Sequence, residues 1–120
     1  MIQFTNKQNG ELIEIYEMDI ENAVDYNLAM KAISELGADW RLPSILELKM
    51  FHANLFKKNL GNFKKHMTYW SSDNDGYNFE VFTFGGHQGL FNNGSFDINS
   101  YSKEGYSCLV RPVRTIFKPR

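Results

Sequence analysis

The segment from Asp73 to Asn78 offers several side chains that could bind a metal ion or a polar ligand. Its sequence, Asp-Asn-Asp-Gly-Tyr-Asn, supplies carboxylate and amide oxygens, which hard cations such as Ca²⁺ prefer. An EF-hand loop is excluded, because glycine stands fourth and Phe84 occupies the place of the bidentate glutamate. Asp, Asn and Gly also favour turns, so we expect a polar turn between two strands and no metal ion.

Histidines and serines provide no recognised catalytic set in this sequence. The three imidazoles, His52, His66 and His87, match neither the H-x-x-x-H nor the H-E-x-x-H spacing of a zinc site. Ser71 and Ser72 have no G-x-S-x-G elbow and no neighbouring histidine, so we expect them to form hydrogen bonds within a strand. The sequence therefore predicts neither an enzyme nor a cofactor.

Cys108 is the only cysteine, which excludes an intramolecular disulfide framework and any site that needs two thiolates. It lies in a run, residues 106–110, that has the composition of a strand. Free cysteine is among the most buried side chains, so we expect a buried and unreactive thiol.

A basic cluster lies near the middle of the chain and consists of Lys57, Lys58, Lys64, Lys65 and His66. Such a cluster could attract an anionic polymer. Cations also interact favourably with the C-terminal end of a helix, so we interpret the cluster as a solvated helix end.

Length and composition predict a single domain that spans residues 1–120. With 42% hydrophobic and 15% aromatic residues, such a chain buries about two thirds of its unfolded surface. The formal net charge of -1 argues against a nucleic-acid partner, which requires a cationic excess. No apolar stretch approaches the roughly 20 residues of a spanning helix, so no membrane partner is predicted. Residues 1–10 lack the pattern of a signal peptide, which leaves a cytoplasmic protein or a mature fragment of an exported protein.

Hydrophobic periodicity predicts a hairpin followed by a helix. Residues 2–6 and 11–17 read as strands joined by the Asn9-Gly10 pair. From about Asn22, apolar residues recur at spacings of three and four, as on one face of a helix that ends at Gly37. The residues of this face are Tyr26, Ala29, Met30, Ile33 and Leu36.

A second helix is predicted to begin at Ser44. Ser44 and Glu47 match the S-x-x-E capping box, in which the hydroxyl and the carboxylate bind backbone N–H groups at a helix start. The helix should fade between residues 57 and 61. Its buried stripe is expected to contain Ile45, Leu48, Phe51 or His52, and Leu55.

The second half of the chain reads as strands and loops. Residues 79–84 carry apolar side chains on both faces, which is typical of a central strand. The last strand is expected over residues 109–116, with Pro112 at an edge or bulge because proline cannot donate to the ladder. Between them, residues 85–106 show little periodicity, and a loop of that length in a compact domain is usually functional or disordered.

Three motifs occur in an order that resembles a known family. They are Trp40-Arg41-Leu42-Pro43-Ser44, Tyr69-Trp70-Ser71-Ser72 and Val110-Arg111-Pro112-Val113-Arg114. From about residue 22 to residue 114, the sequence resembles the C-terminal domain family of the bacterial collagen-like adhesin Lcl. The resemblance implies an α+β, C-type-lectin-like fold, in which two helices pack on a small, mainly antiparallel sheet. It also implies that the first and last strands pair and that a long loop region is displayed.

The motif residues are expected to hold the fold together rather than to bind a ligand. The tryptophans are large enough to wedge between helices and sheet, and the proline fixes the chain direction before the second helix. An arginine near a carboxylate can form an ion-pair clamp, and we expect one between Arg41 and Glu47. Arg111 and Arg114 are expected to form similar clamps, and they point to opposite faces of the last strand. The full structural set is Trp40, Arg41, Pro43, Ser44, Glu47, Trp70, Arg111 and Arg114.

The resemblance also shows which chemistry is missing. The formylglycine-generating enzymes, which are related in fold, depend on two copper-binding cysteines, whereas this chain has one cysteine. Calcium-dependent sugar binding in C-type lectins uses Glu-Pro-Asn or Gln-Pro-Asp followed by Trp-Asn-Asp, and none of these strings occurs.

The leading hypothesis is a non-enzymatic binding or adhesion module that recognises a protein or a glycan through residues 73–106. This region mixes aromatic and small polar residues, as antibody surfaces do, and the resemblance implies ligand contacts on such a loop. The candidate contacts are Asn74, Asp75, Tyr77, His87, Phe91, Asn92, Asn93 and Phe96. Two alternatives stay open: a metal-dependent protein or enzyme that uses His87, Asp73 and Asp75, and a subunit that self-associates through the same face.

Overall fold

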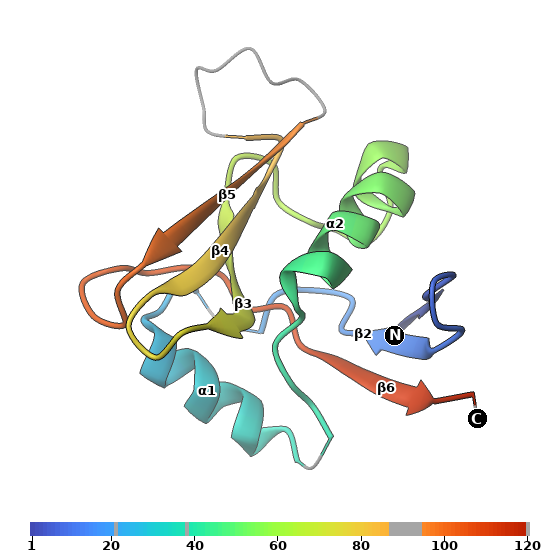
Figure 1. The fold of residues 1–120 in the computed structure, drawn as a ribbon, viewed down its shortest axis with the longest axis horizontal. Helices are drawn as coiled ribbons and strands as arrows, with labels where there is room; N and C mark the ends of the chain where they lie inside the picture. Colours follow the sequence, from blue (N-terminus) through green and yellow to red (C-terminus); the bar gives the residue numbers. More distant parts are fainter. Residues whose placement is uncertain (21, 38, 87–94, 120) are drawn as a thin grey trace.

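The computed structural model describes residues 1–20, 22–37, 39–86 and 95–119. In these residues the chain forms an α+β fold with two helices, a short 3₁₀ helix and six strands (Figure 1). The strands form two three-stranded antiparallel sheets, where the sequence predicted one. Neither helix in the described part of the chain has the length and apolarity needed to cross a membrane.

The first sheet joins the two ends of the chain. Strands β1 (Ile2–Thr5) and β2 (Leu12–Ile15) form the predicted hairpin, and β6 (Val113–Phe117) pairs with β2, so the order is β1-β2-β6. The implied pairing of the first and last strands is therefore wrong, because β2 lies between them. Gly10, with φ 74°, permits the tight hairpin turn. Pro112 lies just before β6 and outside its ladder, so the last strand is shorter than predicted.

Helix α1 (Tyr26–Glu35) begins later than the predicted start near Asn22. The Asp25 carboxylate accepts a hydrogen bond from the Leu28 N–H (2.9 Å) and caps the helix at this point. Met30 was expected on the buried face but is exposed, because it lies about 100° around the helix from the buried Ala29. The fully buried residues of α1 are Ala29 and Ile33.

Helix α2 (Ile45–Asn54) starts with the predicted capping box. The Ser44 hydroxyl accepts the Glu47 N–H (3.1 Å), and the Glu47 carboxylate accepts the Ser44 N–H (2.9 Å). The helix is followed by the 3₁₀ helix η1 (Phe56–Lys58). The predicted stripe is confirmed, since the buried residues include Ile45, Leu48, Phe51, His52 and Leu55.

The second sheet consists of β3 (Thr68–Asn74), β4 (Phe79–Phe84) and β5 (Phe96–Tyr101), in that order. Strand β4 is central, as its two apolar faces predicted. Strand β5 lies within residues 85–106, which were predicted to be a loop. It forms because its whole length pairs with β4, a contact that a composition rich in Asp, Asn and Ser does not reveal.

Two clusters of buried side chains lie on opposite faces of β4. Phe82 and Phe84 pack with α2 and the first sheet, whereas Phe79 and Val81 pack with Trp70 and α1. Successive side chains of a strand point to opposite faces, so one strand supplies both clusters. At one end of the second sheet, residues 74–78 of the β3–β4 connection are exposed to solvent.

Candidate functional site

One end of the second sheet carries a concavity of about 410 Å³, which we call the acid-lined concavity. Its lining residues come from the end of β3, the β3–β4 turn, β4 and β5. They are Asp73, Asn74, Asp75, Asn78, Glu80 and Ser100. Each of these side chains offers an oxygen acceptor, and three are carboxylates. Asn74 and Asp75 belong to the predicted contacts, so the structure brings part of that set to one concave surface.

The β3–β4 turn is held by its own side chains. The Asn74 side-chain oxygen accepts the Gly76 N–H (3.1 Å), and the Asp75 carboxylate accepts the N–H groups of Asn78 (2.7 Å) and Tyr77 (2.9 Å). These bonds, first from Asn78 and then from Tyr77, lower the pKa of Asp75, which is therefore ionised at neutral pH. The predicted polar turn is confirmed, and its geometry is set before any ligand arrives.

Tyr77 lies at the tip of this turn and is 84% exposed. The backbone on both sides of it is fixed by the Asp75 carboxylate. An exposed tyrosine combines a flat apolar ring with a polar hydroxyl. The turn therefore presents an aromatic surface next to the acceptors of the concavity.

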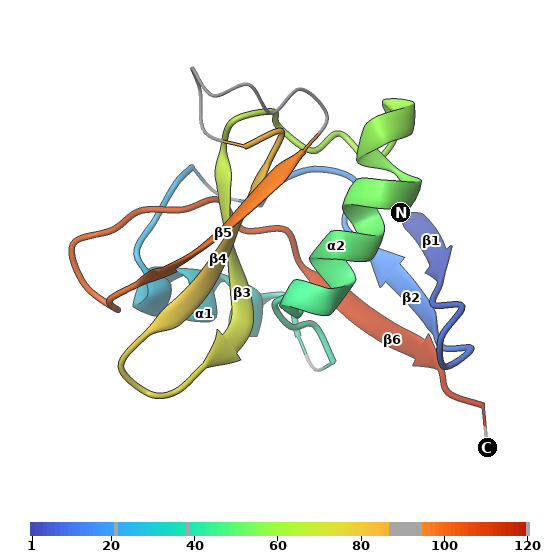
Figure 2. The same cartoon turned by 45° about the horizontal axis from the view of Figure 1, so that its top comes forward.

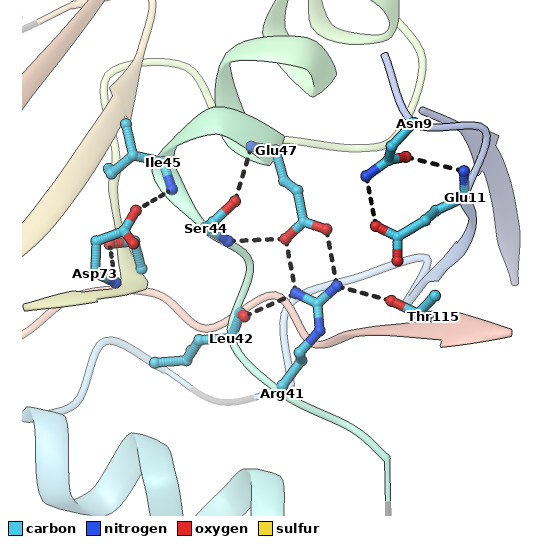
Figure 3. A network of polar contacts seen from close by, with 10 residues as sticks. Asn9, Glu11, Arg41, Leu42, Ser44, Ile45, Glu47, Asp73 and Thr115 are labelled. Carbon is cyan, nitrogen blue, oxygen red and sulfur yellow. Dashed lines mark hydrogen bonds and ion pairs between the residues drawn. The ribbon is translucent and has the colours of Figure 1, made fainter. Parts of the chain in front are cut away.

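Asp73 ties the acid-lined concavity to the start of α2. Its carboxylate accepts the Ile45 N–H (2.8 Å), one of the N–H groups at a helix start that have no partner within the helix. Figure 3 shows this bond beside the capping box formed by Ser44 and Glu47. The positive end of the helix dipole also favours the negative charge of Asp73 at this place.

A bidentate ion pair fixes the same helix start. The Arg41 guanidinium donates to both carboxylate oxygens of Glu47 (2.7 and 2.8 Å) and to the Thr115 hydroxyl (3.0 Å), which links α2 to β6 (Figure 3). This contact is the Arg41–Glu47 clamp expected from the sequence. Burial alone would raise the pKa of Glu47, but hydrogen bonds from Arg41 and Ser44 outweigh that effect and lower it. The clamp therefore fixes the helix start whose Ile45 N–H binds the Asp73 carboxylate.

Glu80 and Ser100 lie opposite each other on β4 and β5. Cross-strand partners project to the same face of a sheet, so the carboxylate and the hydroxyl reach the concavity together. Asn78 lies two residues before Glu80 and shares its side of the chain. Sequence reasoning missed Glu80 and Ser100, because nothing local indicates which residue of a later strand will face Glu80.

Phe96, another predicted contact, does not line the acid-lined concavity. Phe96 was expected in a loop, but it begins β5, and its ring stacks on Phe82 (4.9 Å between centroids) at the edge of the core. This ring stabilises the packing of the second sheet. The other predicted contacts, His87, Phe91, Asn92 and Asn93, lie outside the described residues.

The two tryptophans of the motifs have different surroundings. Trp70 is fully buried, and its indole N–H donates to the Val24 carbonyl (2.7 Å). Trp40 is partly buried between the Tyr16 ring (4.8 Å between centroids) and the Arg114 guanidinium (4.5 Å from the ring centroid). Pro43, which is also buried, accepts the Ser72 N–H through its carbonyl (2.9 Å) and so joins the turn before α2 to β3.

Arg111 is the centre of a buried cluster. It is 0% exposed, and its guanidinium donates to the Asp19 carboxylate (3.0 Å) and to the backbone carbonyls of Tyr16, Gly61 and Asn62. A buried charge is tolerated when it is paired and its donors are bonded. The sequence predicted a clamp at Arg111 but did not identify Asp19, because the two residues are separated by most of the chain.

A larger concavity, of about 590 Å³, lies beside this cluster. It is lined by Met18, Asp19, Ile20, Asn22, Asn62 and Lys64. The Asp19 side chain is only 4% exposed, and both of its carboxylate oxygens accept bonds, one from Arg111 (3.0 Å) and the other from the Tyr69 hydroxyl (3.1 Å). This buried carboxylate therefore serves the fold. We therefore assign the candidate site to the acid-lined concavity, where more acceptors surround the open space.

Metal and thiol chemistry receive no support from the part of the chain that the structure describes. Within it, no three His, Cys, Asp or Glu side chains are grouped to hold a metal ion. Cys108 is buried, as predicted, and burial raises the pKa of its thiol to about 12, so the reactive thiolate is scarce at neutral pH. The arrangement of the concavity suits a different task, which is to accept several hydrogen bonds from one ligand.

Comparison with known proteins yields no match, either among protein-family models or among curated proteins. The geometry of the acid-lined concavity is therefore the basis for assigning a function.

Proposed function

We propose that the chain is a non-enzymatic binding module that recognises a glycan at the acid-lined concavity. The observation that carries this proposal is the gathering of six acceptor-bearing side chains around about 410 Å³ of open space. Small-molecule sites typically occupy about 300–1,000 Å³ and use a small number of placed polar groups. The concavity falls within that range.

Sugars match this surface in their chemistry. Each sugar hydroxyl can donate a hydrogen bond, and carboxylate, amide and hydroxyl oxygens accept such bonds. Bonds to an ionised acceptor such as Asp75 are about twice as strong as bonds between neutral groups. The exposed ring of Tyr77 offers the C–H face of a sugar an apolar contact. Three carboxylates repel an anionic sugar, so the expected ligand is neutral or carries an amine.

A protein ligand is the second candidate, and exposed apolar side chains on the same part of the chain favour it. Tyr77, Ile98 and Tyr106 are exposed. Aromatic residues are enriched at protein interfaces, where the polar end of tyrosine finds a partner and the ring is covered.

We propose a C-type-lectin-like fold related to the Lcl C-terminal domain family, with adhesion as the role. Support comes from the β1-β2-β6 sheet, which contains the first and last strands although β2 separates them, and from the clamps that motif residues Arg41 and Arg111 form. Superposition of an experimental structure on C-type-lectin-like domains tests this. We expect the β1-β2-β6 sheet and both helices to coincide, and a different order of these elements would contradict the assignment.

A glycan array probed with the wild type and single variants tests the binding proposal. Tyr77→Ala, Glu80→Gln and Ser100→Ala change the concavity and its rim, and none of these side chains is buried. We expect each variant to lose about tenfold or more in affinity, the loss typical of a contact residue worth more than about 1 kcal/mol.

Two matched controls change the same residue chemistry elsewhere. Phe117→Ala removes an exposed aromatic ring from β6, and Glu35→Gln neutralises an exposed carboxylate on α1. Both should bind as the wild type does. The proposal would be contradicted if the wild type bound no glycan, or if all three concavity variants bound as tightly as the wild type. Binding to a protein ligand with the same pattern of losses would favour the second candidate.

A further inference from the structure

The chain between Glu47 and Asp73 has an uneven charge distribution. Residues 48–72 contain five lysines and no aspartate, glutamate or arginine. All 14 acidic residues therefore lie outside this stretch, although the net charge of the whole chain is only -1. Four exposed lysines of the stretch are Lys57, Lys58, Lys64 and Lys65.

The structure gathers these lysines at one end of the molecule. The Phe56 ring, next to Lys57, packs on the Phe84 ring (5.3 Å between centroids). The His66 N–H donates to the Phe84 carbonyl (2.7 Å), and the Lys65 side chain packs against Gly85 so closely that a Cβ there would lie 2.8 Å from its Cγ. Both lysine pairs are thus held near the end of β4. Figure 2 shows the connection between α2 and β3 at this end and the β3–β4 turn at the opposite end.

The same segment holds two apolar side chains in solvent. Its backbone is fixed, because Arg111 donates to the carbonyls of Gly61 and Asn62 and the Leu60 N–H is bonded to the end of the preceding helix. Leu60 is nevertheless 53% exposed, and Met67 is 42% exposed. Two exposed apolar side chains therefore lie in the same segment as the exposed lysines, on a backbone that is held in place.

We infer that this surface, residues 56–67, docks on an anionic lipid bilayer, and we call it the basic end. Lysines near an anionic bilayer each raise the affinity about fivefold, and apolar side chains that enter the headgroup region add to it. The prediction that the chain has no membrane partner concerned a spanning segment, which a surface contact does not require. The acid-lined concavity lies at the other end of β3, so it stays accessible when the basic end meets the bilayer.

A nucleic acid fits the basic end less well. Phosphates and bases are commonly bound by arginine forks and by exposed aromatic platforms. Residues 56–67 contain no arginine, and their aromatic rings, Phe56 and Phe63, pack in or against the core. Exposed Leu60 and Met67 gain nothing from a polyphosphate, whereas a bilayer takes them out of water.

Co-sedimentation with lipid vesicles tests the inference. Protein of residues 1–120 is mixed with phosphatidylcholine vesicles that contain or lack phosphatidylglycerol. The salt concentration is about 0.1 M or about 1 M, between which the Debye length falls from about 10 to about 3 Å. We expect binding only to the anionic vesicles and only at the lower salt concentration. The triple variant with Lys57→Glu, Lys58→Glu and Lys65→Glu should bind these vesicles at least about tenfold more weakly than the wild type.

The matched control reverses the same number of exposed lysines elsewhere, namely Lys7→Glu, Lys31→Glu and Lys103→Glu. Both triple variants carry the same net charge, so a difference between them reports the place of the charges. We expect the control to bind within about threefold of the wild type, since its three lysines lie outside the basic end. Equal losses in both triple variants would overturn the inference.

The apolar contribution is tested with two leucines of nearly equal exposure. Leu60→Ser should weaken vesicle binding about fivefold, while Leu28→Ser on α1, where the leucine is 52% exposed, should not. The inference would be overturned if the wild type bound mixed-sequence DNA but not anionic vesicles. It would also be overturned if both leucine variants bound the vesicles as tightly as the wild type. Glycan binding involves the opposite end of β3, so the two proposals fail independently.

Discussion

The Arg111 cluster and the acid-lined concavity both concentrate charged side chains, but they differ in burial and in the sign of the charges they combine. Arg111 and Asp19 carry opposite charges, are almost fully buried and lie 3.0 Å apart. The concavity combines three carboxylates that line open space. Low dielectric strengthens the attraction in the first region, and water screens the repulsion in the second.

This difference separates residues that hold the fold from residues that can meet a ligand. Within the described residues, no buried side-chain nitrogen or oxygen lacks a hydrogen-bond partner. The hydrogen-bonding groups that can meet a ligand therefore lie at the surface, and several acceptors gather at the concavity. Substitutions in the Arg111 cluster should lower stability, whereas substitutions in the concavity should lower binding.

The largest effect on stability is expected for Arg111→Met. The change leaves the Asp19 carboxylate buried without its main partner and removes the bonds to three backbone carbonyls. We expect the free energy of unfolding to fall by about 3–5 kcal/mol, as when one member of a buried ion pair is removed. Urea denaturation followed by circular dichroism measures this loss.

Arg114→Met is the control for that experiment. Arg114 pairs with Glu14 (2.6 Å), but its side chain is 37% exposed, so solvent weakens the pair. We expect a loss of about 1 kcal/mol or less. If both variants lost the same stability, burial would not distinguish the Arg111 cluster from a surface pair.

The Arg41–Glu47 clamp should give an intermediate effect that depends on pH. The folded pKa of Glu47 lies below its ordinary value of 4.5, so the folded state binds fewer protons than the unfolded state. The resulting stability is present above pH 4.5 and is lost as the pH falls through the lowered pKa. Glu47→Gln should therefore cost about 1–3 kcal/mol at neutral pH, and the difference from the wild type should narrow in acid. A gap of constant size across urea titrations at several pH values would contradict this.

A smaller loss is expected for Tyr69→Phe at the edge of the Arg111 cluster. The Tyr69 hydroxyl donates to Asp19 (3.1 Å) and accepts the Lys64 N–H (3.0 Å). Burial raises the pKa of Tyr69 well above its ordinary value, so the group stays a donor at neutral pH. Removing it should cost about 1 kcal/mol in thermal or urea unfolding. An unchanged stability would show that the hydrogen bond from this hydroxyl is not needed to stabilise the Asp19 carboxylate.

The smallest stability effect is expected in the concavity. The double variant Glu80→Gln, Ser100→Ala should change the free energy of unfolding by no more than about 0.5 kcal/mol, because neither side chain is buried. The same protein sample should lose glycan binding. A loss of stability without a loss of binding would reverse the roles assigned to the two regions.

Local features of the fold were predictable from the sequence. The capping box needs only Ser44 and Glu47, three residues apart, and the hairpin turn needs a residue that tolerates positive φ, which Gly10 supplies. The central position of β4 followed from apolar residues on both of its faces. The polar turn at Asp75 followed from residue types that favour turns.

Features that depend on distant pairing were not predictable. The Asp19–Arg111 bond joins opposite ends of the chain, and the division into two sheets depends on which strands pair. For the same reason, only part of the candidate site was predicted. Asn74 and Asp75 lie in a local turn, whereas Glu80 and Ser100 meet only after β4 and β5 have paired.

The most direct test of the proposed binding site is an NMR titration of isotope-labelled protein with the glycan that binds most strongly on the array. We expect the largest changes in chemical shift at the backbone amides of residues 73–80 and 99–101. Amides around Arg111, Gly61 and Asn62 should change little. The largest changes around the Arg111 cluster, or small changes spread evenly over the molecule, would contradict the assignment of the acid-lined concavity as the ligand site.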